Sequence, residues 1–396
     1  MILTIEELCT AIVDCEHKTS PIDESGEFFA VGTPAMRGNA IDFTQARRIS
    51  ESTYVSWTRR MTPRVGDLLF AREAPVGPIV LIPESENIAT GQRTMLMRPD
   101  PSLADSRFLY YLLSSPAKQD QLQSLAGGST VAHLNVADVR NFPMDVPPID
   151  DQRAIADVLG ALDDKIAANT KLASAADDLA SALFRWFVRG LPMSDRNFAD
   201  VARVSGGGTP STKVPEYWGG NVNWATPTDV TGLSGPYLES TSRKISPEGL
   251  RSCSSELFEP GAILMTSRAT IGAFAIAQNS MAVNQGFIVV EPIDSALRFW
   301  LFHEMRSRVD EFVSLANGAT FLELSRGNFK KLTVRLAEPA MMNEFGYKAA
   351  SLHATASAAL RESHTLAATR DALLPQLMSG KLRVRDAERI LEDAGV

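Results

Sequence analysis

Two stretches of this chain repeat each other: LAGGSTVAHLNVADVRNFPMDVPP, residues 125–148, and LANGATFLELSRGNFKKLTVRLAEP, residues 315–339. Each reads Leu-Ala, a small polar turn with Gly and Thr, a Leu, a basic residue, an apolar run typical of a strand, and a Pro. The copies lie about 190 residues apart in a chain of 396 residues. The repeat is much longer than the period of about 20–50 residues found in solenoids, so it indicates a duplicated domain.

The similarity continues upstream of these stretches. GDLLFAREAPVG (66–77) matches GAILMTSRATIG (261–272), and IATGQRTMLMRP (88–99) matches MAVNQGFIVVEP (281–292). In both halves, strand-like apolar runs are separated by Gly and Pro and interrupted by short amphipathic helices. Each half therefore predicts a mixed α/β (α+β) domain.

Each half ends in a segment with heptad periodicity. Apolar residues at alternating steps of four and three run from Ile155 to Phe187, and a weaker seam runs from Phe345 to Leu377. A helix of about 38 residues is roughly 57 Å long, which exceeds the width of a small domain. We expect the two helices to pair as an antiparallel coiled coil, with Asn169 fixing their register. The residues expected at this helix or partner interface are Ile155, Leu159, Leu162, Ile166, Asn169, Leu183, Phe187, Leu352, Leu366, Leu373 and Leu377.

These patterns divide the chain into four segments. A first globular domain spans residues 1–147, a central helix spans 148–190, a second globular domain spans 191–338, and a C-terminal helix with its tail spans 339–396. The motif DDK at residues 163–165 resembles part of a metal-dependent nuclease site. Because it falls on the seam helix, we expect a solvated helix face there.

The composition is that of a soluble globular protein, with 44% hydrophobic and 22% charged residues. No apolar run approaches the roughly 20 residues of a membrane span, and the acidic N-terminal segment lacks the basic region of a signal peptide. Three cysteines without metal spacing favour reduced thiols, so we expect a cytoplasmic protein. A net charge of -8 argues against a wholly basic surface, but it permits a local basic face.

Motifs for catalysis are incomplete. The Gly-rich stretch SGGGTPSTK at 205–213 lacks the spacing of a phosphate-binding loop, and we expect a flexible turn ahead of a strand. VPPID at 146–150 lacks the polar and aromatic residues of a DNA amino-methyltransferase motif, and HEMRS at 303–307 lacks the second His of a zinc helix. We therefore predict a non-catalytic chain, without a metal site of its own, that recognises another molecule.

Basic residues favour DNA as that molecule. Six arginines lie between Arg37 and Arg64 against only Asp42 and Glu51. Arg suits guanine edges and phosphates, and Lys suits phosphates as a point charge. The residues expected to contact DNA are Arg37, Arg59, Arg60, Arg72, Gln92, Arg93, Lys213, Arg243, Lys244, Arg268, Gln285, Lys330 and Lys331.

The sequence resembles the specificity (S) subunits of type I restriction–modification systems, which act in phage defence. The residues that carry the resemblance are GDLLFAREAPVG, GQRTMLMRPD, the run from Gly127 to Lys171, SGGGTPSTKVPEYWGG and the terminal LLPQLMSGKL. The resemblance implies two target recognition domains, each reading one half of a split DNA site, and two helices that set the spacing. It also implies methyltransferase subunits, which bind S-adenosylmethionine, and separate restriction/translocase subunits. The internal duplication suggests two methyltransferase subunits per chain. This chain would bind no cofactor.

The first half departs from the second in one place. It has VDCEHKTSP at 13–21 where the second half has SGGGTPST, so the two domains are expected to read different bases of an asymmetric target. Two alternatives remain open: a self-contained nuclease with an unrecognised site, and a coiled-coil scaffold that binds proteins. Metal-dependent cleavage by the chain alone would identify the first, and weak salt dependence of binding would indicate the second.

Overall fold

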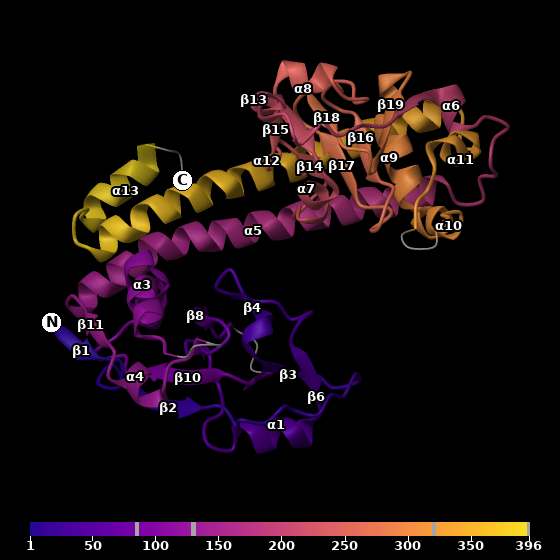
Figure 1. Cartoon of the computed structure of the whole chain (residues 1–396). Helices are drawn as coiled ribbons and strands as arrows, with labels where there is room; N and C mark the ends of the chain where they lie inside the picture. Colours follow the sequence, from indigo (N-terminus) through magenta and orange to yellow (C-terminus); the bar gives the residue numbers. More distant parts are fainter. Residues whose placement is uncertain (84–86, 128–131, 319–321, 394–396) are drawn as a thin grey trace. The chain divides into compact units, whose positions relative to one another are not determined.

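The computed structural model describes residues 1–83, 87–127, 132–318 and 322–393 (Figure 1). The chain divides into two compact units. The first unit contains residues 1–165 and 365–396, and the second contains residues 166–364. Residues 128–131 and 319–321, which belong to the two repeated stretches, lie outside the described residues.

A four-stranded antiparallel sheet forms the centre of the first unit, in the order β2-β10-β7-β8. Its strands are β2 (Cys9–Asp14), β7 (Leu68–Arg72), β8 (Val76–Leu81) and β10 (Thr94–Pro99). A smaller sheet has the order β6-β3-β9, with β3 and β9 parallel. Its strands are β3 (Phe28–Val31), β6 (Arg47–Ile49) and β9 (Ile88–Thr90). Apolar side chains of both sheets, such as Val31, Leu69 and Leu96, share one core.

Short elements complete the first unit. Its helices are α1 (Glu51–Thr58), α2 (Ser106–Ser114), α3 (Pro116–Leu125), α4 (Val136–Arg140) and α13 (Val384–Asp393). Its two-stranded pairs are β1 (Ile2–Thr4) with β11 (Pro143–Asp145) and β4 (Met36–Arg37) with β5 (Ala40–Ile41). The carboxylate of Asp105 accepts hydrogen bonds from the backbone N–H groups of Arg107 and Phe108, which explains where α2 begins.

The second unit repeats this plan. Its larger sheet has the order β12-β19-β16-β17-β14, and its smaller sheet has the order β15-β13-β18 with β13 and β18 parallel. The larger sheet contains β12 (Ala202–Ser205), β14 (Tyr237–Leu238), β16 (Ile263–Thr266), β17 (Phe274–Ala277) and β19 (Phe287–Pro292). The smaller sheet contains β13 (Trp218–Ala225), β15 (Lys244–Ile245) and β18 (Met281–Val283). The helices of this globule are α6 (Phe198–Val201), α7 (Pro227–Thr231), α8 (Pro247–Arg251), α9 (Arg298–Arg306), α10 (Val309–Ser314) and α11 (Arg326–Lys331).

Strand order matches between the units. β2, β10, β7 and β8 of the first unit occupy the positions of β12, β19, β16 and β17 in the second, and β6-β3-β9 corresponds to β15-β13-β18. In each smaller sheet, two strands far apart in sequence are parallel. The predicted duplication of a mixed α/β domain is confirmed.

Two long helices follow the globular domains: α5 (Ile149–Phe187, 39 residues) and α12 (Pro339–Met378, 40 residues). In the first unit, a guanidinium nitrogen of Arg370 lies 2.5 Å from a carboxylate oxygen of Asp163. In the second unit, the amide of Asn169 donates to the carboxylate of Glu362 at 2.8 Å, and the rings of Phe184 and Phe345 lie 5.3 Å apart. Later residues of α5 thus meet earlier residues of α12, which confirms the antiparallel pairing. Among the described residues, no helix is both long and apolar enough to cross a membrane.

The seam residues lie at this pairing or against the globules. Those that are buried are Ile155, Leu159, Leu162, Asn169, Phe187, Leu366, Leu373 and Leu377, and those that are half-buried are Ile166, Leu183 and Leu352. In the second unit, Ala173 and Ala176 of α5 share one apolar cluster with Ala356 and Ala359 of α12 and with Tyr237. Small side chains allow the two helices to lie close together there.

The sequence expectation for the motif DDK was wrong at Asp163. The hydroxyl of Tyr111 donates to the Asp163 carboxylate at 2.5 Å, and Arg370 binds the other oxygen. Burial, followed by this carboxylate, raises the pKa of Tyr111. Asp163 therefore connects α2, α5 and α12, while the neighbouring Asp164 is exposed and binds Arg107.

A chain of four polar groups occupies the corresponding place in the second unit. The Nε2 atoms of His303 and His353 lie 2.9 Å apart, His353 Nδ1 lies 2.7 Å from the Tyr237 hydroxyl, and His303 Nδ1 lies 3.5 Å from Ser181 Oγ. Burial is the main cause that lowers the pKa of His303 to about 2 and that of His353 to about 4. Both imidazoles are therefore neutral in the folded protein.

These two buried imidazoles make stability depend on pH. In the unfolded chain their pKa is about 6.5, so between roughly pH 6.5 and pH 4 the unfolded state binds more protons than the folded state. The free energy of unfolding is expected to fall as the pH decreases through this window, by up to about 1.4 kcal/mol per pH unit for each His. Urea unfolding at several pH values measures this slope.

The variant His303→Phe should reduce the slope by about one proton. The wild-type chain, measured over the same pH range, is the reference. An unchanged slope in His303→Phe would show that the buried pair does not control the pH dependence.

Candidate nucleic-acid interface

Three chain segments meet at the same place in each unit. In the first unit, the backbone N–H of Arg72, at the end of β7, donates to the carbonyl of Arg93 at 3.0 Å, and the N–H of Leu134 donates to the carbonyl of Arg72 at 2.9 Å. In the second unit, the N–H of Ser267 donates to the carbonyl of Gly286 at 2.8 Å, and the N–H of Leu324 donates to the carbonyl of Ser267 at 3.0 Å. The same backbone framework thus carries Arg72, Gln92 and Arg93 in the first unit and Arg268 and Gln285 in the second.

Side chains on this framework differ between the units. Glu73 lies 3.5 Å from Arg93 in the first unit, whereas Arg268 lies 2.9 Å from Glu323 in the second. Directly after the strand end, the first unit thus has the acidic Glu73 where the second unit has the basic Arg268. The two frameworks present different charges to a ligand, although their backbones are alike.

Arg72 is largely buried rather than exposed. Its guanidinium donates to Asp14 Oδ1 at 3.1 Å and to the Leu134 carbonyl at 3.3 Å, and only 9% of the residue is accessible. Asp14 also lies 2.9 Å from His17 Nε2. In this structure Arg72 connects β7, β2 and the loop before α4, so its contacts are internal ones.

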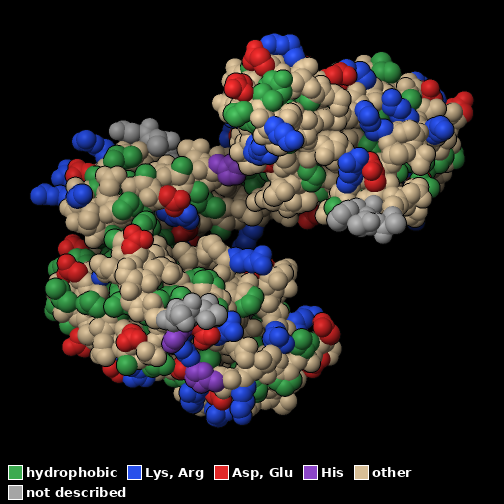
Figure 2. Space-filling view, viewed as in Figure 1, with side chains coloured by type: hydrophobic (Ala, Val, Ile, Leu, Met, Phe, Trp, Pro, Cys, Tyr) green, Lys and Arg blue, Asp and Glu red, His purple; other side chains and the backbone are tan. Residues whose placement is uncertain are grey.

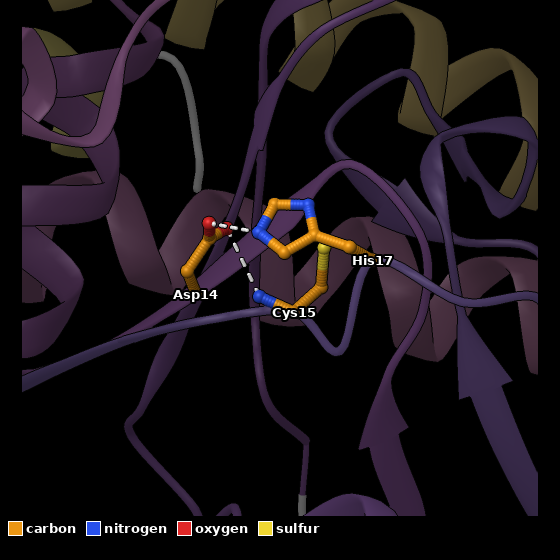
Figure 3. Close-up of side chains that lie close together, drawn as sticks. All are labelled: Asp14, Cys15 and His17. Carbon is orange, nitrogen blue, oxygen red and sulfur yellow. Dashed lines mark hydrogen bonds and ion pairs between the residues drawn. The ribbon is translucent and has the colours of Figure 1, made fainter.

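Asp14, Cys15 and His17 form the one group among the described residues whose ligand atoms could together hold a metal ion, all within 4.8 Å of one another (Figure 3). The guanidinium of Arg72 binds Asp14 and lies 3.4 Å from His17 Nδ1. Its fixed positive charge lies beside two of the three ligand atoms and disfavours a cation there. We interpret this group as an ion-pair network.

Arg59 and Arg60, which follow α1, share one acidic partner. Their guanidinium groups each lie 3.0 Å from a different oxygen of Glu16, and Arg60 also donates to the Asp14 carbonyl at 2.6 Å. Both remain accessible, with 58% and 43% of their side chains exposed. Their charge is partly compensated, and their outer edges can still reach a ligand.

Other polar groups of the first unit surround a hollow of about 190 Å³. Gln92 and Arg93, in the turn between β9 and β10, lie at this hollow together with Arg47 and Gln45. Arg37 is exposed on β4 and does not line this hollow. The structure thus brings Gln92 and Arg93 together at the hollow, and a backbone hydrogen bond connects Arg93 to Arg72.

The Gly-rich stretch of the second unit is anchored, which corrects the expectation of a flexible turn. The indole N–H of Trp224 donates to the Gly208 carbonyl at 3.0 Å, and that of Trp218 donates to the Ser211 carbonyl at 3.2 Å. Gly207 passes so close to Val283 that a Cβ atom would lie 1.9 Å from the Val283 carbonyl oxygen. Only glycine fits at this position.

Cations surround this anchored stretch. The guanidinium of Arg243 lies 3.8 Å from the ring centre of Trp218, and the side chain of Arg326 covers Gly206. Lys213 and Lys244 are exposed, as are Lys330 and Lys331 on α11. Within the described part of the chain, these four lysines make no ion pair. In Figure 2, Lys and Arg side chains are scattered among acidic ones on the visible face, consistent with local basic sites on an acidic chain.

One surface of α5 was missed by the sequence analysis. Beside the buried seam runs a second heptad series of exposed apolar residues, with Leu172, Leu179 and Trp186 exposed by 48%, 50% and 68%. The full series is Ala168, Leu172, Ala175, Leu179, Ala182 and Trp186. Its steps of four and three residues are visible in the sequence. The sequence alone does not show whether these apolar residues widen the buried seam or form a separate exposed surface.

Two copies of one α/β domain, each followed by a long helix, define a duplicated-domain protein with polar turns at equivalent positions. The chain belongs to the family of the type I restriction modification DNA specificity domain, whose model matches residues 3–175 and 192–338. Together these segments cover most of the chain.

Individual relatives agree with this family. The MjaIX specificity subunit of Methanocaldococcus jannaschii is 36% identical over 146 residues. This match covers 34% of that protein, about a third of its length, and 36% of this chain. The HindI specificity subunit of Haemophilus influenzae is 20% identical over a match covering 80% of this chain and 86% of that protein. The crystal structure of the S subunit from M. genitalium, 15% identical, covers 95% of each chain with a TM-score of 0.62, which shows a shared fold.

The internal contacts of Arg72 predict a structural effect of its loss. Arg72→Ala leaves the Asp14 carboxylate and the Leu134 carbonyl without this donor, so the free energy of unfolding should fall by about 2–3 kcal/mol. Arg64→Ala is the matched control, because Arg64 is exposed and its side chain makes no ion pair in the described residues; it should change stability by less than about 0.5 kcal/mol. Urea unfolding of the isolated chain compares them, and equal stabilities would contradict the structural role.

Proposed function

We propose that this chain reads a bipartite, asymmetric DNA target for a type I restriction–modification complex, with one half-site read by each globular domain. The observation that supports the proposal most directly is the repeated framework of backbone hydrogen bonds with different side chains upon it. A repeated backbone presents side chains at equivalent positions of the two domains, and different side chains contact different bases. The chain performs recognition, and its partners perform methylation and cleavage.

Exposed lysines support binding to the DNA backbone. Lys330 and Lys331 lie on α11, directly after the loop that contacts the strand end in the second unit. Point charges of this kind position a duplex without reading its sequence. The net charge of -8 suggests that the isolated chain binds DNA weakly and that the assembled complex binds it well.

Mapping of modified adenines tests this function. The chain is co-expressed with its cognate methyltransferase subunit, and methylated positions are mapped across the host genome. We expect a two-part motif with a fixed spacer and two unlike halves. A single continuous motif, or methylation that does not depend on this chain, would reject the proposal. Metal-dependent cleavage by the purified chain alone would instead support the nuclease alternative.

A further part of the proposal concerns the exposed apolar series on α5. Its heptad spacing is that of a helix that packs against another helix, and Leu172, Leu179 and Trp186 are too exposed to stabilise the second unit. We assign this surface to a helix of a methyltransferase subunit. The internal duplication favours two such subunits per chain, and the restriction/translocase subunits then bind the assembled complex.

Leu179→Glu should weaken binding of the methyltransferase subunit by on the order of 10-fold or more, because it places a charge in the centre of an apolar contact. Ser174→Glu adds the same charge at an exposed position on a different face of α5 and should bind as the wild type does. Calorimetric titration of the methyltransferase into each variant measures the affinity. If both variants bind equally well, the methyltransferase uses another surface.

A further inference from the structure

Equivalent turns of the two units each expose one glutamine. Gln92 lies between β9 and β10, and Gln285 lies between β18 and β19. The residue before each glutamine is fixed by the same contact: Gly91 N–H donates to the Val31 carbonyl at 2.8 Å, and Asn284 N–H donates to the Ala225 carbonyl at 3.0 Å. The two side chains therefore leave the same backbone position in the two units.

Of these two glutamines, only Gln285 has a partner among the described residues that orients its amide. The hydroxyl of Thr209, in the Gly-rich stretch, lies 2.5 Å from Gln285 Oε1. The stretch itself is held by Trp224, which binds Gly208, and by the close passage of Gly207 over Val283. Thr209 is thus a fixed point, and the rotation of the Gln285 amide is restricted.

In the first unit the corresponding residue faces elsewhere. Val13 pairs with Leu96 of β10, and Ser205 pairs with Val289 of β19, so continuing both strands by four residues aligns His17 with Thr209. The backbone of His17 has a φ of 54°, and its ring bonds to Asp14 (Figure 3). Among the described residues, the side chain of Gln92 has no hydrogen-bond partner.

We propose that Gln285 reads one adenine of the second half-site, that Thr209 is the positioning residue for its amide, and that Gln92 reads the equivalent base of the first half-site less strictly. This inference rests on the proposed function. A glutamine amide presents a donor beside an acceptor, which matches N7 and the N6 amino group of adenine in the major groove. The Thr209 hydroxyl occupies one lone pair of Oε1, which leaves the other lone pair and the NH2 group for the base.

The surroundings of Gln285 suit a DNA edge. Arg326 covers Gly206, and Arg243 stacks on the same Trp218 that holds Ser211, so cations flank the stretch that carries Thr209. Such groups can bind phosphates on either side of a base that the amide reads. An amide already held in position loses less side-chain entropy on binding than a free one, and this increases the difference between the correct and the wrong base.

The test uses the chain assembled with its methyltransferase subunits and duplexes carrying the mapped target. Each base pair of both half-sites is changed in turn, and each adenine of the second half-site is also replaced by 7-deazaadenine, which lacks N7. Affinities are measured for the wild type and for Thr209→Val, Thr209→Ser, Gln285→Ala and Gln92→Ala. Thr209 and Gln285 are both exposed, so these substitutions leave the core intact.

For the wild type, we expect one adenine of the second half-site at which a base change or 7-deazaadenine weakens binding by on the order of 10-fold. Gln285→Ala should remove this penalty at that position alone, and Thr209→Val should reduce it several-fold. Thr209→Ser, which keeps the hydroxyl, should restore it. Gln92→Ala should reduce the penalty at one position of the first half-site. In the wild type this penalty should be smaller than the one at the adenine read by Gln285.

The inference would be overturned if base changes cost the same affinity in Gln285→Ala as in the wild type, or the same in Thr209→Val as in Thr209→Ser. It would also be overturned if the base assigned to Gln92 carried a larger penalty than the base assigned to Gln285. Each of these results would leave the proposed function intact, because the wild-type complex would still prefer its mapped target. Failure of the proposed function itself has a different signature, since the wild-type complex would then bind mapped and scrambled duplexes equally.

Discussion

Backbone hydrogen bonds between three distant segments are the constraint on which the candidate interface depends. In each unit they connect the end of a central strand, the turn that enters its neighbour strand, and the loop after the repeated Leu-Ala phrase. Backbone groups are the same in every residue apart from proline, so this framework tolerates substitution of the side chains it carries. A duplicated domain could therefore keep its geometry while Glu73 in one unit and Arg268 in the other took opposite charges.

The contacts between the globules and the long helices are likewise alike in position but different in chemistry. Both units place polar groups where the globule meets the helix pair, but the chemistry is not the same. The first unit uses the hydroxyl of Tyr111 and the guanidinium of Arg370 on the carboxylate of Asp163, and the second uses the neutral imidazoles of His303 and His353. The first set retains charge, whereas the second is neutral because burial lowers both pKa values.

Ion pairs within the protein limit how many of its arginine side chains can contact a ligand. Arg72 is buried against Asp14, Arg59 and Arg60 share Glu16, and Arg268 binds Glu323. Partners of this kind hold a guanidinium in position and reduce its net charge, which favours orientation over non-specific attraction. Lys213, Lys244, Lys330 and Lys331, and Arg243, which stacks on Trp218, have no such acidic partner among the described residues.

The sequence by itself determined the duplication, the mixed α/β class and the two long helices, because each depends on local signals: repeated motifs, strand-like runs between Gly and Pro, and heptad steps sustained over about four heptads. It also named Gln92 and Gln285 among the residues expected to contact DNA. Only the tertiary structure decided which candidates are exposed, since Arg72 and Asp163 meet partners such as Asp14 and Tyr111 that are distant in sequence. The hydrogen bond from the Thr209 hydroxyl to Gln285 Oε1 likewise joins residues that are distant in sequence. Such contacts depend on how sheets and helices pack, and a local pattern does not contain that information.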